Sequence, residues 1–151
     1  MDLRNDRSFY DLLAQSFERL THQSLVPKEI RPDDAPRWLY EEAPFGILAH
    51  STAADPIFVY GNKTAQRRFE YSWEELTALP SRLSAEAPER SERQRFLDEV
   101  QRNGFVAGYK GIRIAKSGKR FWIEDAIVWR LTNADGTYRG QAAFLPRTSD
   151  V

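Results

Sequence analysis

The chain has 151 residues, of which 41% are apolar and 29% are charged, and its 22 Lys and Arg residues are balanced by 22 Asp and Glu residues. This length and composition predict one globular domain with a single core. The balanced charge argues against nucleic acid or a membrane as partner, because the sequence has neither a basic stripe nor an apolar stretch long enough to span a bilayer.

The chain contains no cysteine. This excludes disulfide bonds, thiolate metal ligands and a cysteine nucleophile. The opening residues, MDLRNDRSFY, lack the apolar core of a signal peptide, so we expect a cytoplasmic location.

Residues 1–36 are interpreted as an N-terminal helix followed by a proline-rich connector. The helix is predicted because apolar residues recur at helical spacing with charged residues between them, and either Asn5 or Ser8 is expected to cap it. Prolines then interrupt the pattern, so the main domain is placed from Arg37 onward. The residues in question are Phe9, Leu12, Leu13, Phe17 and Leu20 in the helix, and Pro27, Pro32 and Pro36 in the connector.

The middle of the chain predicts a hairpin followed by helices. After a short helix near residues 38–42, strands over 45–51 and 56–60 are separated by the turn TAAD. Asn62 is expected to cap one helix, and Ser72 with Glu75 matches a capping box for the next. A longer helix begins at Ser91 and ends near Asn103 and Gly104.

The last third alternates apolar and polar residues, which predicts a three-stranded meander whose turns are KSGK and NADG. The resulting class is α+β: a five-stranded antiparallel sheet with helices on one face, preceded by the N-terminal amphipathic helix. The domain is expected to span residues 37–146, with a tail over 147–151.

Several segments carry a family likeness. GNKTAQRRFEYSWEEL resembles the first helices of PAS domains, and KSGKRFW resembles a hairpin of the flavin-binding LOV group. More closely, LAHSTAADPIFVYGN, LPSRLSAE, YKGIRIAKSGKRFWIEDAIVW and GQAAF together resemble the MEKHLA domain, a PAS-related family. The likeness covers residues 38–144 and implies a PAS-like fold.

The same likeness bears on cofactors. LOV photochemistry needs a cysteine, so its absence excludes that reaction. The positions at which LOV strands contact flavin through Asn correspond here to Arg113 and Ile123, which disfavours flavin. PAS domains that bind haem commonly use a His on the long helix, and residues 91–104 contain none, which disfavours haem. The cofactor, if one binds, stays unknown.

Alternation along residues 121–131 places Asp125 on an otherwise apolar face with Ile123 and Trp129. If the hairpin closes as in the resembling domains, Arg113 lies on that face too, and an ion pair between Arg113 and Asp125 is predicted. The pair has two interpretations: a polar anchor in a ligand pocket, or a self-satisfied pair that only fixes strand register.

His50, Tyr60, Trp129 and Gln141 are further candidates for the wall of a ligand pocket. Each also has a structural interpretation, because a histidine at a strand end is commonly hydrogen-bonded and buried aromatic residues are usually core. His22 and His50 are too far apart in the sequence to predict a metal site. The sequence also lacks the motifs of nucleophilic, phosphoryl-transfer and metalloprotease sites, so no enzymatic activity is expected.

The outer sheet face, expected to carry Ile112, Ile114, Trp122, Ala126 and Val128, needs a cover. The N-terminal helix is expected to provide it, from the same chain or exchanged across a homodimer.

We expect a sensory module that binds an unidentified small molecule and acts through dimer contacts or a signalling partner. The alternatives are an interaction or dimerisation module without ligand, and a small α+β-cone enzyme using Asp125, Arg113 and His50. A connected cavity of about 300 Å³ or more would favour a ligand or catalysis over an interaction module.

Overall fold

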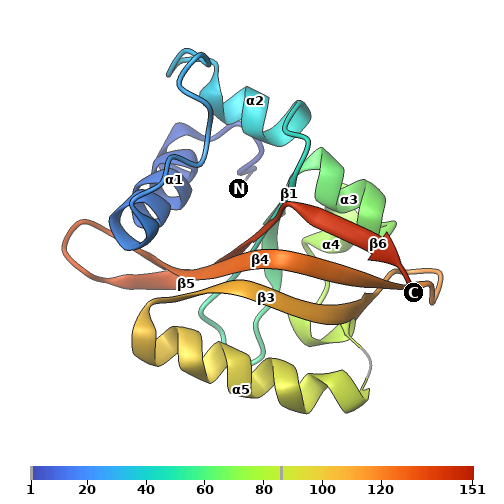
Figure 1. Ribbon diagram of the computed structural model, residues 1–151. Coiled ribbons are helices and arrows are strands. Elements are labelled where there is room, and N and C mark those ends of the chain that lie inside the picture. Colours follow the sequence, from blue (N-terminus) through green and yellow to red (C-terminus); the bar gives the residue numbers. More distant parts are fainter. Residues whose placement is uncertain (1, 86) are drawn as a thin grey trace.

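The computed structural model describes residues 2–85 and 87–151. Figure 1 shows a curved sheet with helices packed against both of its faces. In chain order the elements are α1 (Arg7–Thr21), α2 (Ala35–Glu41), β1 (Gly46–His50), β2 (Phe58–Gly61), α3 (Lys63–Phe69), α4 (Trp73–Leu76), the 3-10 helix η1 (Ser81–Ser84), α5 (Ala87–Asn103), β3 (Phe105–Ile114), β4 (Arg120–Thr132), β5 (Tyr138–Leu145) and β6 (Arg147–Asp150).

The sheet is antiparallel and its strands lie in the order β2-β1-β5-β4-β3. This confirms the predicted α+β class with a β1–β2 hairpin and a C-terminal meander. The described residues form six strands and not the five that were predicted, because β6 pairs with the first part of β4. Residues 147–150, which were expected to belong to a tail, are therefore part of the sheet.

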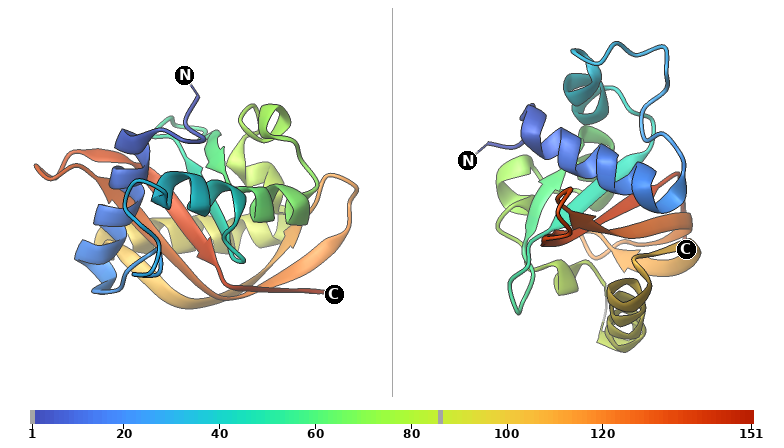
Figure 2. Two further views of the ribbon diagram at one scale, coloured as in Figure 1. Left: turned by 90° about the horizontal axis from the view of Figure 1, so that it is seen from above. Right: turned by 90° about the vertical axis from the view of Figure 1, so that its left-hand side faces the viewer.

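Helix α1 covers one face of the sheet, while α3, α4 and α5 lie against the other (Figures 1 and 2). Leu13 and Phe17 of α1 are buried in one core cluster with Trp129 and Leu131 of β4. The rings of Phe17 and Trp129 meet edge to face, with their centroids 4.8 Å apart. The N-terminal helix thus covers the outer face of its own chain, one of the two arrangements expected for it.

Local capping explains where the early helices begin. Asp6, and neither Asn5 nor Ser8, caps α1, since its carboxylate accepts a hydrogen bond from the Phe9 amide at 2.8 Å. The predicted caps of α3 and α4 are confirmed: Asn62 accepts from the Ala65 amide, and Ser72 forms its capping box. These bonds satisfy amides that lack a partner inside the first helical turn.

An irregularity in β4 decides which side chains face which layer. Asp125 has a left-handed φ of 55°, and the β3–β4 register shifts opposite Tyr109 and Gly111. A bulge inserts one extra residue, so the alternation of side chains changes face after it. Before the bulge, Phe121 and Ile123 pack toward α3; after it, alternation leads to the buried residues Ala126 and Val128 on that same side. The prediction that Ala126 and Val128 lie on the outer face is therefore wrong.

Candidate functional site

The candidate site is a cavity of about 60 Å³ between the sheet and the helices α3 and α5, which we call the core cavity. The cavity is lined by residues from all five strands β1 to β5 and from α3, α5 and η1. Its wall is mostly apolar and includes Leu48, Phe58, Phe69, Phe96, Ile123 and Leu145. Such an enclosure is a poor environment for an unpaired polar group.

Three of the predicted site residues line the core cavity: Arg113 from β3, His50 from β1 and Gln141 from β5. All three are buried, with exposed fractions of 8%, 8% and 4%. The pairing of β1 with β5 sets His50 directly opposite Gln141, which explains how residues distant in the sequence meet. Their gathering in one cavity makes this the site that the structure favours.

The hydrogen bonds at the site are few. The Arg113 guanidinium donates to the Ile112 carbonyl at 2.8 Å and to the Tyr109 hydroxyl at 3.5 Å. His50 Nδ1 lies 3.0 Å from the carbonyl oxygen of Ser51, which orients the imidazole ring. Gln141 Oε1 is buried and has no hydrogen-bond partner in the part of the chain that the structure describes.

Two features of the cavity wall were not anticipated as site residues. Ser84 is buried at the end of η1, where its hydroxyl donates to the Ser81 carbonyl at 2.7 Å. Phe96 and Leu97 of α5 also line the cavity. The helical pattern identifies Phe96 as buried, but no sequence signal connects α5 or Ser84 to this cavity, because only the packing of α5 onto β3 and β4 brings them there.

Asp125 does not lie in the core cavity, and the predicted ion pair between Arg113 and Asp125 is wrong. Asp125 is at the bulge, its side chain is 56% exposed, and it pairs with Arg147 of β6. The left-handed backbone turns the carboxylate outward, away from the face that Arg113 occupies. The α+β-cone alternative, which needs Asp125 beside Arg113 and His50, therefore has no assembled site.

Trp129 and Tyr60 also lie outside the core cavity. Both belong to the core cluster beneath α1, on the other side of the sheet. Tyr60 packs edge to face against Tyr40 and Trp73, and burial raises the pKa of its hydroxyl far above the usual value. Both aromatic residues are thus placed as core.

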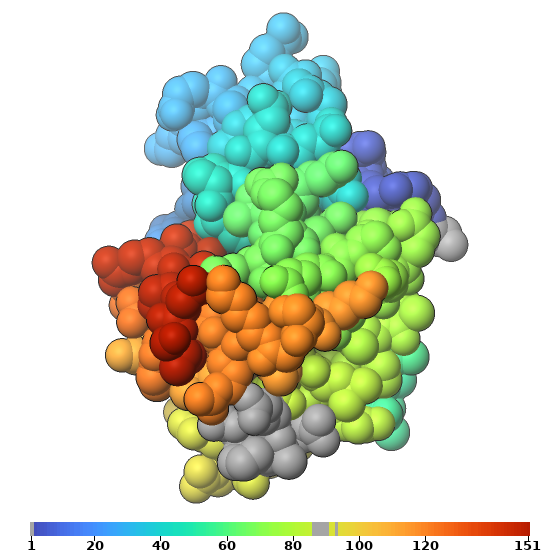
Figure 3. Space-filling model, turned by 90° about the vertical axis from the view of Figure 1, so that its right-hand side faces the viewer, coloured from blue at the N-terminus to red at the C-terminus, as the bar shows by residue number. Residues whose placement is uncertain are grey.

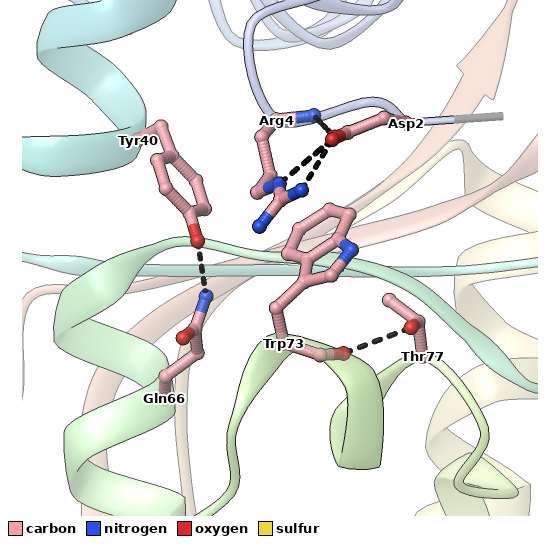
Figure 4. A network of polar contacts seen from close by, with 6 residues as sticks. All are labelled: Asp2, Arg4, Tyr40, Gln66, Trp73 and Thr77. Atoms are coloured by element: carbon pink, nitrogen blue, oxygen red, sulfur yellow. Dashed lines mark hydrogen bonds and ion pairs between the residues drawn. The ribbon is translucent and has the colours of Figure 1, made fainter.

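The surroundings of Tyr60 tie the N-terminal segment to the helices (Figure 4). Gln66 Nε2 donates to the Tyr40 hydroxyl at 2.9 Å. The Arg4 guanidinium pairs with Asp2 and lies 5.3 Å from the centre of the Trp73 ring. This arrangement holds the start of the chain against α4.

A larger surface groove, of about 640 Å³, lies between α1, the β1–β2 turn, α4 and the start of β5. Its lining includes Leu3, Phe9, Ile57 and Trp73, and Ile57 is 38% exposed. None of the predicted site residues lines this groove. It is wider than the core cavity but lacks a buried charged residue.

The described residues present neither a metal-binding cluster nor a membrane-spanning helix. They contain no group of three or more His, Asp or Glu side chains arranged to hold a metal ion. None of their helices is both long enough and apolar enough to cross a bilayer.

Comparison with a family model identifies the sequence relationship. The model of the MEKHLA domain matches residues 7–149, which is most of the chain and includes α1. No curated protein matches the chain.

Solved structures share the fold. A PAS domain from Colwellia psychrerythraea superposes with a TM-score of 0.64 at 15% identity, over 78% of this chain and 95% of that one. The light-state dimer of the fungal blue-light photoreceptor Vivid gives 0.61 at 17% identity, over 89% and 90%. An RNA-binding light-oxygen-voltage receptor gives 0.62 at 21% identity, over 85% of this chain and 35% of that one. At these identities the likeness establishes a PAS fold.

Proposed function

Because the chain belongs to the MEKHLA domain family and has the PAS fold, we propose that it is a sensory module that binds a small molecule in the core cavity. The observation that carries the proposal is that three buried polar side chains line one otherwise apolar cavity, His50 and Gln141 side by side and Arg113 farther along the sheet. Binding sites for small molecules combine apolar walls with a few convergent polar groups.

The size of the core cavity limits the ligand. At about 60 Å³ it is far below the volume of roughly 300 Å³ at which drug-sized sites begin. One water molecule needs about 10–15 Å³ on this measure, so the cavity has room for a ligand of about four to six non-hydrogen atoms. The three-ring system of a flavin does not fit, and Arg113 and Ile123 stand where the resembling LOV strands have Asn.

Helix α5 is the element whose movement we propose as the response. Among its described side chains only Phe96 and Val100 are buried. Phe96 stacks on Tyr109 of β3 with the ring centroids 3.9 Å apart. This small contact holds α5 over the cavity. A ligand that binds the protein more tightly when α5 is in one position than in another shifts the population of molecules toward that position.

A cavity-filling substitution tests the proposal. Ala143 lines the core cavity, and Ala143→Leu places a branched side chain in it. In native mass spectrometry we expect extra mass on the purified wild-type protein and none on the Ala143→Leu variant. Ala134→Leu, in the exposed β4–β5 turn, is the matched control and should keep the extra mass. A wild-type protein without bound mass, or a filled variant that still carries it, contradicts the proposal.

We also propose that the module acts as a homodimer through α1 and the part of the outer sheet face that α1 leaves uncovered. Ile112, Ile114 and Trp122 are only partly buried on that face, and Lys110 Nζ lies 4.6 Å from the Trp122 ring centre. Partly exposed apolar side chains gathered on one face favour a partner. Sedimentation analysis should show that the wild-type protein is a dimer and that the Trp122→Glu variant is a monomer. The circular dichroism spectrum of the variant should match that of the wild type. A monomeric wild-type protein contradicts this proposal.

The second candidate function is an interaction module that binds no small molecule. The small volume of the core cavity and the wider surface groove favour it. The two candidates differ in the outcome for Ala143→Leu. If the protein is an interaction module, the variant should be as stable as the wild type or more stable, and it should lose no bound mass, because no ligand occupies the cavity that the leucine fills.

A further inference from the structure

The core cavity holds a positive charge that no carboxylate balances. Arg113 is 8% exposed, and its guanidinium donates to two neutral oxygens, of Ile112 and Tyr109. Among the described residues, no Asp or Glu side chain forms an ion pair with it. Arginine keeps its charge in proteins and has five N–H donors, so donors remain unused at a position where an unpaired charge is costly.

The strand registers place Arg113 at one end of the core cavity. Arg113 lies opposite Phe121, whereas Gln141 lies opposite Arg130, nine residues farther along β4. At the usual rise of a strand this separation is about 30 Å. A ligand of about four to six non-hydrogen atoms, the size that the cavity allows, does not reach from one to the other. A ligand that binds Arg113 is therefore held by groups at that end alone.

Tyr109 and Gly111 set the position of the guanidinium. A Cβ atom at Gly111 would lie 2.6 Å from the Tyr109 hydroxyl oxygen, so this hydroxyl lies over the glycine backbone. Arg113 Nη2 is 3.5 Å from the same hydroxyl, and Gly111 pairs with Ile123 of β4. The Arg113 side chain thus bends back along β3 toward Ile123, on the face of the sheet that lines the cavity.

The wall beside the guanidinium is apolar. Phe69, Ile123 and Leu145 line the cavity and belong to one buried core cluster. The sheet register places Leu145 beside Ala126, which is the partner of Tyr109. An inorganic anion has no apolar part to contact this wall. A carboxylate with an alkyl tail can place its charge on the guanidinium and bury its tail against these side chains.

From these observations we propose that the ligand is an unbranched short-chain carboxylate such as propionate. Its carboxylate accepts two parallel hydrogen bonds from Arg113, and its alkyl tail lies along Ile123 and Leu145 toward the middle of the cavity. His50 and Gln141, at the other end, do not contact it. This rests on the proposed function, that the core cavity binds a small molecule, and adds the chemical class of that molecule.

The same geometry connects ligand and helix. The Arg113 guanidinium carbon lies 5.5 Å from the centre of the Tyr109 ring, and that ring stacks on Phe96 of α5. A carboxylate that draws the guanidinium toward the cavity changes its contact with Tyr109. The change passes to α5 through Phe96.

Three probes test the chemistry by amide NMR titration of the wild-type protein. Propionate carries both the charge and the tail, propionamide has the same size without the charge, and formate has the charge without the tail. We expect propionate to bind at least about tenfold more tightly than either analogue, because propionamide leaves the guanidinium charge unpaired and formate leaves the apolar wall without a contact. The largest shifts should occur at Arg113, Ile123 and Leu145, and Gln141 should shift least.

Variants assign the contact to Arg113. Arg113→Met keeps the apolar stem and should abolish propionate binding, whereas Arg102→Met, at an exposed position of α5, should leave it unchanged. Without propionate, the urea midpoint of Arg113→Met should equal or exceed that of the wild type, because an apolar side chain removes the cost of burying an unpaired charge. If Arg113→Met does not fold, Arg113→Lys keeps the charge without the two-pronged geometry and should weaken propionate binding by about tenfold.

The outcomes separate the two proposals. Propionamide binding as tightly as propionate, with shifts at the same amides, overturns the carboxylate inference but supports a ligand in the core cavity. Formate binding as tightly as propionate overturns the assignment of the tail to the apolar wall. Propionate binding that Arg113→Met leaves unchanged overturns the assignment of Arg113. An absence of binding by all three probes overturns the carboxylate inference, while bound mass lost on Ala143→Leu would still support the proposed function.

Discussion

Asn62 shows how one side chain joins three elements. It is fully buried, and Oδ1 accepts from the amides of Ala65 and Ile47 while Nδ2 donates to the carbonyls of Leu39 and Phe45. The cap on α3 was predicted from the sequence. The other three bonds, which connect β1 with the end of α2, depend on the fold.

Asn62→Asp should destabilise the protein strongly while keeping the helix cap. Aspartate caps a helix as well as asparagine, but it lacks the two N–H donors and brings a negative charge to two carbonyl oxygens. We expect a loss of about 3 kcal/mol in the free energy of unfolding, measured with urea at neutral pH. The exposed cap variant Ser72→Ala should lose only about 1 kcal/mol; equal losses would contradict the role of the Asn62 donors.

Gly140 is required where β5 approaches β1. Its φ is 130°, and a Cβ atom there would lie 2.3 Å from the His50 carbonyl oxygen. Gly140→Ala should therefore separate the two strands beside the core cavity and destabilise the protein by more than about 2 kcal/mol. At Gly136 a Cβ atom would meet open space, so Gly136→Ala should lower the free energy of unfolding only by the cost of a left-handed backbone, about 1–2 kcal/mol. A smaller loss at Gly140 than at Gly136, by urea denaturation, would refute this.

Strand β4 is the element that separates the two sides of the molecule. Its bulge sends Phe121 and Ile123 toward α3 and, farther along, Trp129 and Leu131 toward α1. Without the extra residue at Asp125, all four side chains would lie on one face. One inserted residue thus allows a single strand to contribute to the core on both sides.

The change in stability caused by a substitution at Asp125 should depend more on the left-handed backbone conformation at this position than on the loss of its charge. Asp125→Gly removes an exposed ion pair but suits a positive φ, so its stability should stay within about 1 kcal/mol of the wild type. Asp125→Val, which is β-branched, should lose about 2 kcal/mol in urea denaturation. The opposite order would indicate that the pair with Arg147 matters more than the bulge.

At the scale of the whole molecule, polar contacts fasten the β3–β4 turn and the C-terminus to the helices. Figure 3 shows that the β3–β4 hairpin lies beside the α3–α4 region, with the C-terminal segment next to it. Glu70 accepts from the Ser117 amide at 3.0 Å, and Glu75 pairs with Lys116. Asp150 pairs with Arg68 at 3.0 Å and with Lys119 at 3.3 Å.

These carboxylates predict a loss of stability in acid. The bond from Ser117 lowers the pKa of Glu70, the bond from Lys116 lowers that of Glu75, and the bonds from Lys119 and Arg68 lower that of Asp150. A carboxyl whose pKa is lower in the folded state stabilises the protein above its unfolded value, which is 4.5 for Glu and 3.8 for Asp. That stabilisation is lost as the pH falls through the folded value.

The urea midpoint should therefore be constant near neutral pH and decrease as the pH falls below 4.5. The double variant Glu70→Gln and Glu75→Gln should show a shallower decrease than the wild type. Glu74→Gln, a neighbouring carboxylate without these partners, is the control and should follow the wild-type curve. An unchanged slope in the double variant would show that these contacts contribute little.

Much of the architecture was determined by the sequence alone, because it depends on interactions within a few residues. The capping bonds of Asn62 and Ser72, the turns at KSGK and NADG, and the alternation of the meander are local, so they predicted the α+β class and the order of its elements. Asp6 took the cap position of α1 in place of Asn5 or Ser8, because several capping residues occur together there and helix ends shift by a residue or two.

Only the tertiary structure decided which candidates form a site. Arg113, His50 and Gln141 share the core cavity, whereas Tyr60 and Trp129 lie under α1 and Asp125 points outward. A prediction that side chains alternate strictly between the two faces of a sheet cannot anticipate this placement. One bulge moves every later side chain of the strand to the opposite face. Strand β6 was missed for a related reason: its pairing with β4 is a long-range contact, and its short polar sequence carries no apolar pattern.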